Sequence, residues 1–185
     1  MMKQTTAFLL LSLALMMGLQ AQKYLTKTGT IDFSSETPME KIEAKNQQAI
    51  SVLNTEDGGM AFSVLMKGFN FEKALMQEHF NEKYVESDKF PKAKFNGKIT
   101  NLDEVDFSTP GEYDVHVKGD MTLHGVTKEV EADGTLVVQD GTIRGYAAFD
   151  LVLADFDIKI PKVVKGNIAE SVSIVVNANY EPYNK

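Results

Sequence analysis

The sequence predicts an all-β fold, an extended antiparallel β-barrel of about eight strands with one amphipathic helix inserted. Most of the chain alternates apolar and polar residues, as half-buried strands do. Strong turn signals such as Asp57-Gly58 separate the alternating segments. Residues 74–95 depart from this pattern, because their apolar residues recur at helical spacing. Closing long strands into a barrel removes their exposed edges, which favours a barrel over the alternative, a two-sheet sandwich.

Residues 1–21 predict a secretory signal peptide. Lys3 supplies a positive start, residues 7–19 form an apolar run too short to span a bilayer, and Ala21 is a small residue suited to cleavage. Residues 22–185 are long enough for one domain with a sizeable core. We therefore expect a soluble single-domain protein that is periplasmic or otherwise secreted.

Composition excludes several kinds of site and partner. The chain has no Cys, so it has no disulfides, no thiolate metal ligands and no Cys nucleophile. The same absence excludes a lipid anchor on an N-terminal Cys. A net charge of −7 argues against nucleic acid or an anionic membrane as a general partner.

The inserted helix is predicted where Leu75, Met76, His79, Phe80 and Tyr84 recur at spacings of three and four, before Pro91. Such a helix can lie across an open barrel end and extend its apolar wall. Capping a closed core is the alternative.

The predicted strands each direct alternate side chains to the interior. Residues 44–55 and 60–69 form a hairpin, residues 92–100 resume as a strand, and two strands flank Asp140-Gly141. Gly119 lies on the apolar face, where a bend or a close neighbour is expected. Gly134 is expected to form a bulge, with a second turn as the alternative. The side chains expected on the inner faces are Met60, Phe62, Val64, Met66, Tyr113, Val115, Val117, Met121, Leu123, Ala147, Phe149, Leu151, Leu153, Val172, Ile174, Val176, Ala178 and Tyr180.

A barrel of this size is either packed by its side chains or holds one small ligand. The inner set is rich in Met and Phe, and Met is unbranched and adaptable, which suits flexible apolar ligands. Ordinary core filling is the alternative.

Catalytic and metal-binding candidates are few. His116 and His124 are expected on one face of one strand, roughly 27 Å apart, so they cannot share a metal, and we expect no metal site. There is no G-x-S-x-G nucleophile motif. Asp155 and Asp157 alternate with apolar neighbours and could pair for acid–base chemistry, although solvated carboxylates are the alternative.

Lysines gather in two stretches, Lys89, Lys92 and Lys94, then Lys159, Lys162 and Lys165. They could form a positive rim for a ligand head group, or they could be ordinary solvated lysines.

Three segments resemble the signatures of the YceI-like family, which are lipocalin-like polyisoprenoid-binding proteins. They are "MQEHFNEKYVESDKFPKAKFNGKI", "GDMTLHGVTKEV" and "ADFDI", in the family's order between residues 76 and 158. The matched positions are His79 with Phe80, Phe90 with Pro91, and residues 122–128. The lipocalin G-x-W pattern is absent because the chain has no Trp.

The resemblance implies a lipocalin-like barrel with a deep apolar cavity that holds an isoprenoid chain, and no catalytic centre. We therefore predict an exported protein that binds a polyisoprenoid or similar long-chain apolar lipid for transport, storage or sequestration. No cofactor besides that lipid, no nucleic acid and no stable membrane insertion are expected, and a homodimer stays open. An enzyme acting on such a lipid, through Asp155, Asp157 or a His, and a closed-core barrel are the alternatives.

The predicted binding site comprises inward-facing apolar residues and a lysine rim. The predicted cavity residues are Phe62, Val64, Met66, Met76, Phe80, Tyr84, Phe95, Val115, Val117, Met121, Phe149, Leu151, Ile174 and Val176. The predicted head-group rim consists of Lys92, Lys159 and Lys162.

Overall fold

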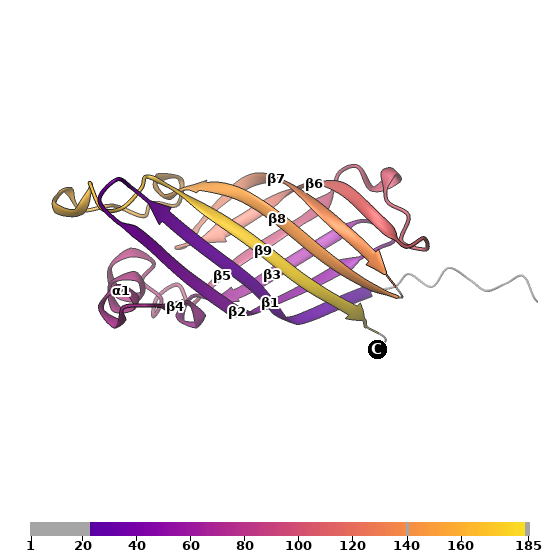
Figure 1. The fold of residues 1–185 in the computed structure, drawn as a ribbon, viewed down its shortest axis with the longest axis horizontal. Coiled ribbons are helices and arrows are strands. Elements are labelled where there is room, and N and C mark those ends of the chain that lie inside the picture. The colour runs from indigo at the N-terminus through magenta and orange to yellow at the C-terminus, as the bar shows by residue number, and fades with distance from the viewer. Residues whose placement is uncertain (1–22, 140, 184–185) are drawn as a thin grey trace, which may run out of the picture.

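Eight antiparallel strands close into a barrel in the computed structural model, which describes residues 23–139 and 141–183 (Figure 1). The neighbours run β1-β9-β8-β7-β6-β5-β3-β2, and β2 pairs with β1 to complete the ring. A short ninth strand, β4, pairs with β2. The strands are β1 (Lys23–Glu36), β2 (Lys41–Asn54), β3 (Gly59–Leu65), β4 (Asn70–Phe71), β5 (Lys92–Ile99), β6 (Gly111–Leu123), β7 (Val126–Gln139), β8 (Thr142–Val152) and β9 (Ser171–Pro182). This confirms the barrel, whereas the predicted signal peptide and Asp140 lie outside the described residues.

Two hairpin turns follow directly from their residues. Gly58 has a φ of +71°, and the Asp57 side chain accepts a hydrogen bond from the Gly59 backbone N–H at 2.8 Å, as the Asp-Gly signal predicts. Between β6 and β7, His124 and Gly125 both have positive φ, 51° and 79°, as a two-residue turn of the I′ kind requires. The prediction that His124 belongs to a strand is therefore wrong, because β6 ends at Leu123.

Gly119 is opposite Gly97 across the β5–β6 ladder. A Cβ on Gly119 would collide with the Gly97 Cα and the Asn96 carbonyl oxygen, which confirms the expected close neighbour. Gly134 differs from its prediction, since it pairs in unbroken register with Val115 and ends the β7–β8 ladder opposite Ala147. It is a point of close backbone approach, because a Cβ there would lie 2.6 Å from the Tyr146 carbonyl oxygen.

The barrel wall is not hydrogen-bonded along its whole length. The β2–β3 ladder covers only Ile50↔Ser63 to Leu53↔Met60, after which β2 pairs with β4. The fully buried Asn46 side chain bridges the split by donating a hydrogen bond to the Leu65 carbonyl at 2.9 Å. A side chain thus replaces the missing backbone pairing.

The predicted helix is present as α1 (Ala74–His79), continued by a π-helical turn (Phe80–Tyr84). None of the helices in the described part of the chain is long and apolar enough to cross a membrane. Short 3-10 turns lie in the connections that follow β3, β5 and β8. They are Met66–Gly68, Leu102–Glu104, Leu153–Phe156 and Lys162–Val164.

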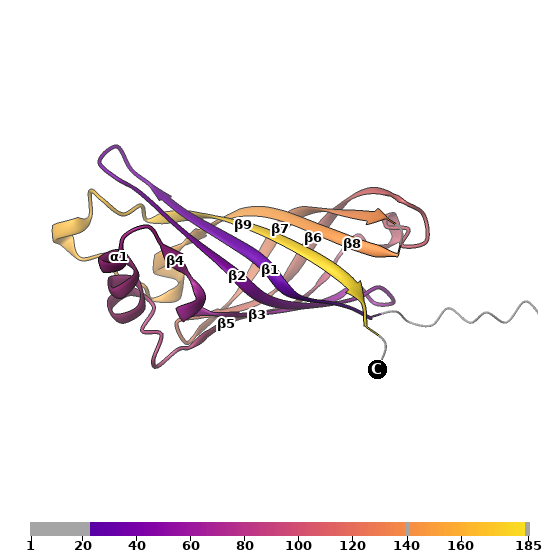
Figure 2. The same ribbon diagram turned by 60° about the horizontal axis from the view of Figure 1, so that its bottom comes forward.

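Helix α1 and the turn Lys162–Val164 lie at one end of the barrel, and the C-terminal end of β9 lies at the other (Figures 1 and 2). We call the first the helix end and the second the far end. The described core divides into two clusters. Phe69, Val85 and Phe156 belong to the first, and Tyr24, Leu53 and Ile143 belong to the second.

Candidate ligand-binding site

A cavity of about 430 Å³ lies in the barrel interior. Its lining includes Phe33 and Phe80 from the first core cluster and Ala178 and Tyr180 from the second. The volume falls within the range typical of small-molecule sites, roughly 300–1,000 Å³. The interior is therefore not filled by side chains, as a closed-core barrel would require.

All fourteen residues of the predicted cavity set line this cavity. They come from strands β3, β5, β6, β8 and β9, from Met66 after β3, and from α1 and its π-helical turn. Period-two alternation directs every second strand residue inward, which is why their positions could be predicted without the tertiary fold. Their role in binding a ligand stays a prediction.

An aromatic cluster attaches the helix to the barrel. Of its residues, the predicted cavity set contained only Phe80. The Phe33 and Phe80 rings contact each other, and each also contacts Phe69 and Phe71, with ring centroids between 5.0 and 6.4 Å apart in these five pairs. Three of them were missed, although Phe33 alternates with polar residues in "TIDFSS" and Phe69 and Phe71 alternate in "GFNF". Leu75, expected with the apolar face of the helix, is 60% exposed instead.

Polar groups line the cavity near the helix end. Glu40 accepts a hydrogen bond from the Asn167 side chain at 3.1 Å and lies 3.7 Å from the Lys73 Nζ. The buried Ser35 Oγ accepts a hydrogen bond from the Ala169 backbone N–H at 2.9 Å. His79 of α1 also belongs to the lining. A hydroxyl or carbonyl of a bound ligand would find hydrogen-bonding groups here.

The predicted lysine rim does not line the cavity. Lys92, Lys159 and Lys162 are exposed and absent from the lining, which contains Lys94. Whether a lysine reaches the cavity depends on the path of the backbone around it, and the alternation of apolar and polar residues does not predict that path.

A buried polar pair lies toward the far end of the barrel, where Tyr180 lines the cavity. The Tyr180 hydroxyl and the Ser51 hydroxyl are hydrogen-bonded at 2.7 Å, and both side chains are almost completely buried. Burial raises the pKa of Tyr180 to about 12, and the hydrogen bond to Ser51 opposes this only in part. Because the two hydroxyls hydrogen-bond to each other, this end of the cavity offers a ligand mainly apolar surface.

The three segments that carry the family resemblance meet around His124. Its Nδ1 donates a hydrogen bond to the Phe156 carbonyl at 3.0 Å, and its Nε2 lies 2.8 Å from Oε2 of Glu86. The Phe90 ring packs edge-on against the imidazole, with centroids 4.9 Å apart. The motifs thus join the β6–β7 turn to the segment after the helix and to the turn after β8.

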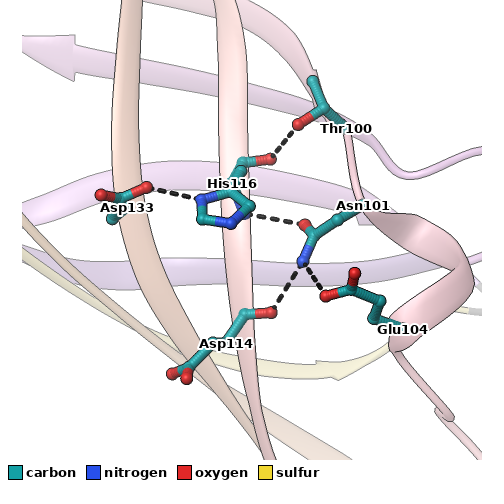
Figure 3. Close-up of polar contacts among 6 residues, drawn as sticks. All are labelled: Thr100, Asn101, Glu104, Asp114, His116 and Asp133. Atoms are coloured by element: carbon teal, nitrogen blue, oxygen red, sulfur yellow. Dashed lines mark hydrogen bonds and ion pairs between the residues drawn. The ribbon is translucent and has the colours of Figure 1, made fainter.

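His116 lies on the outer wall in a separate polar cluster (Figure 3). Its Nδ1 is 2.6 Å from the Asp133 carboxylate, and this hydrogen bond raises the His116 pKa. The Asn101 side chain accepts from the His116 backbone N–H at 2.8 Å and donates to the Asp114 carbonyl at 3.1 Å, so it extends the β5–β6 ladder by one step. The cluster therefore lies at the end of the β5–β6 ladder, outside the cavity.

The remaining chemical candidates are not brought together. Asp155 and Asp157 are exposed and lie outside the cavity lining, while Phe156 and Ile158 between and after them are buried. Among residues 23–139 and 141–183, no group of three His, Cys, Asp or Glu side chains could hold a metal ion.

An antiparallel barrel around an apolar cavity, with a helix at one end, defines a lipocalin-like class of protein. The YceI-like domain model matches residues 16–180, and the chain belongs to the YceI-like family. No curated protein matches the chain.

Solved structures share the fold at low sequence identity. A polyisoprenoid binding domain from Saccharophagus degradans, implicated in plant cell wall breakdown, superposes with a TM-score of 0.75 at 12% identity, over 89% of this chain and 100% of that one. BcnA from Burkholderia cenocepacia gives 0.68 at 12% identity, over 82% and 95%. The YCEI protein of Campylobacter jejuni gives 0.57 at 12% identity, over 75% and 81%.

Proposed function

We propose that this protein is an exported binding protein that holds a long-chain apolar lipid in the barrel, with a polyisoprenoid as the leading candidate. The observation that carries the proposal is the cavity itself, which is lined mainly by Phe, Met, Val, Leu and Ile side chains from most strands of the barrel. Such a lining has few groups that could bind a compact polar ligand. An apolar chain fits its chemistry.

The energetics favour a long chain over a short one. Each buried methylene contributes roughly 0.8 kcal/mol, so about fifteen buried carbons give about 12 kcal/mol before costs. Association costs roughly 4–15 kcal/mol. Tight binding therefore needs a preformed cavity and most of a long chain inside it.

The relatives and the N-terminal sequence support the two finer parts of the proposal. The similar domain from Saccharophagus degradans is described as binding polyisoprenoid, which makes this lipid class the first to test. The predicted signal peptide at residues 1–21 supports export to a periplasmic or secreted location. Transport, storage and sequestration are the roles that such a carrier could serve.

The decisive experiment is a titration of the delipidated protein with prenyl alcohols of increasing length. Affinity should rise with each added isoprene unit until the cavity is full and then level off, because each unit buries more apolar surface. Extraction of the purified protein, followed by mass spectrometry, identifies any lipid that copurifies. Affinity that does not change with chain length would refute the lipid-cavity function.

A further inference from the structure

The helix end of the barrel exposes large apolar side chains on three separate tips. They are Met39 in the β1–β2 turn, Leu75 on α1 and Val163 in the turn Lys162–Val164, and they are 73%, 60% and 91% exposed. Among the exposed large apolar side chains of the described residues, these three have the largest exposed fractions. Figures 1 and 2 show all three tips at the same end of the molecule.

The three tips are joined to one another. Met39 packs next to Gly166, where an added Cβ would lie 2.9 Å from the Met39 sulfur. Glu40 connects the same hairpin to Asn167 by a hydrogen bond at 3.1 Å and to Lys73, beside α1, by an ion pair at 3.7 Å. The tips therefore form one surface, which we call the apolar rim: Met39, Leu75 and Val163.

The apolar rim is next to the residues that line the cavity at the helix end. Glu40 and Asn167, which link the tips, also line the cavity, as do Met76 and His79 of the helix that carries Leu75. Any surface that covers the apolar rim would therefore face the helix end of the cavity, where the polar groups of the cavity lining lie.

Positive charge flanks the most exposed tip. Lys159 and Lys162 make no ion pair with any described residue, whereas Lys165 pairs with Glu170 at 2.9 Å. The negative charge of the β1–β2 hairpin is partly neutralised, because Glu43 forms an ion pair with Lys41 at 2.8 Å and Glu40 forms one with Lys73. Val163 therefore lies beside two lysines without an ion pair among the described residues, in a connection that also carries the exposed Asp155 and Asp157, on a protein whose net charge is −7.

We infer that the apolar rim docks on the surface of a lipid bilayer that contains anionic lipids. Apolar tips beside lysines suit the bilayer interface, because the apolar side chain enters the acyl boundary while the ammonium groups stay among the head groups. Anionic lipids attract basic residues within about a Debye length, even when the whole protein is acidic. The docking is peripheral and reversible, and it brings the helix end of the cavity to the membrane.

A single-tryptophan probe tests this directly, since the chain contains no Trp. Val163→Trp should show blue-shifted emission when phosphatidylcholine vesicles containing phosphatidylglycerol are added to the purified protein. The matched control is Ile50→Trp, at a side chain 46% exposed on the outer wall of β2, which should show no shift. No shift at position 163, or equal shifts at both positions, would overturn the inference.

Removing single lysines provides a second test of the docking surface. Lys162→Ala should weaken binding to the mixed vesicles roughly fivefold, because each lysine near an anionic surface contributes about that factor. Lys98→Ala, an exposed lysine on β5, should leave binding unchanged. Equal losses in the two variants would contradict docking through this end.

Light scattering tests whether a second copy of the protein, instead of a bilayer, covers the apolar rim. If the protein is a dimer that Val163→Ser dissociates, a second copy covers the apolar rim and the membrane inference fails. A monomer in which Val163→Ser abolishes vesicle binding supports it. All these measurements need no cavity ligand, so their outcome is independent of the chain-length titration.

Discussion

His124 combines two tasks that a sequence pattern cannot show together. It adopts a positive φ in a two-residue turn, and both its ring nitrogens contact groups from other segments, Glu86 and the Phe156 carbonyl. Asn tolerates the same backbone conformation but is too short to reach both partners.

His124→Asn should therefore destabilise the protein by about 1–3 kcal/mol, because the mostly buried imidazole is lost together with its hydrogen bonds to the carbonyl of buried Phe156 and to the partly exposed Glu86 carboxylate. Urea unfolding followed by circular dichroism measures the loss. His116→Asn is the control, since that imidazole is solvent-exposed and its pairing with Asp133 is screened by water. An equal loss in the two variants would show that the contacts of His124 contribute nothing beyond those of a surface residue.

Tyr180 makes stability depend on alkaline pH. Its folded-state pKa of about 12 lies above the ordinary value of 10.0, so the folded state holds the proton more tightly than the unfolded state. The resulting stabilisation is complete below pH 10 and is lost as the pH rises from 10 toward 12, by about 3 kcal/mol in total. Urea unfolding between pH 9 and pH 12 measures this slope, and Tyr180→Phe should reduce it; an unchanged slope in that variant would assign the dependence to other groups.

At the scale of elements, the backbones of β5 and β6 approach each other closely at a pair of opposite glycines, Gly97 and Gly119. Gly119→Ala should destabilise the barrel strongly, because the new Cβ meets the backbone of Gly97 and Asn96, which cannot move without breaking the ladder. Gly111→Ala, at the start of β6, is the control, since the atoms nearest to its Cβ belong to the Tyr113 side chain, not to backbone, and lie at 3.2 Å or more. Thermal unfolding compares them, and similar melting temperatures would show that the close approach relaxes.

The inserted helix shows how far periodicity predicts an element. Met76, Phe80 and Tyr84 recur at helical spacing and all line the cavity, as predicted. Leu75 belongs to the same run but is exposed, because a helix only six residues long followed by a π-helical turn has a narrow buried face. The side of the helix that faces the barrel is fixed where the Phe80 ring packs against Phe33, Phe69 and Phe71, and Phe33 is the one of these three that is distant in sequence.

At the scale of the whole molecule, the cavity and the surface lysines should respond differently to substitution. Val117→Glu places a carboxylate in the apolar lining and should abolish binding of a long prenyl alcohol if the variant folds, because burying the unpaired charge costs more than the ligand contacts return. Lys162→Ala should leave that binding nearly unchanged, since this exposed lysine is outside the lining. Isothermal titration of both variants, with circular dichroism to confirm folding, provides the comparison; retained binding in folded Val117→Glu would exclude the cavity as the lipid site.

Local physical rules let the sequence by itself determine the strands, the Asp57-Gly58 turn, the helix and the fourteen cavity-lining positions. A strand alternates its side chains between two faces, a left-handed turn selects Gly, and a helix repeats every three to four residues, so neighbours in the chain carry the information. Only the tertiary structure decided that the rim lysines stay outside the lining, that Gly134 pairs in register and that Asn46 bridges a split wall. It also decided that Met39, Leu75 and Val163 meet at one end of the barrel. Each of these depends on register, loop path and ring closure, which join residues far apart in sequence through contacts that no local pattern encodes.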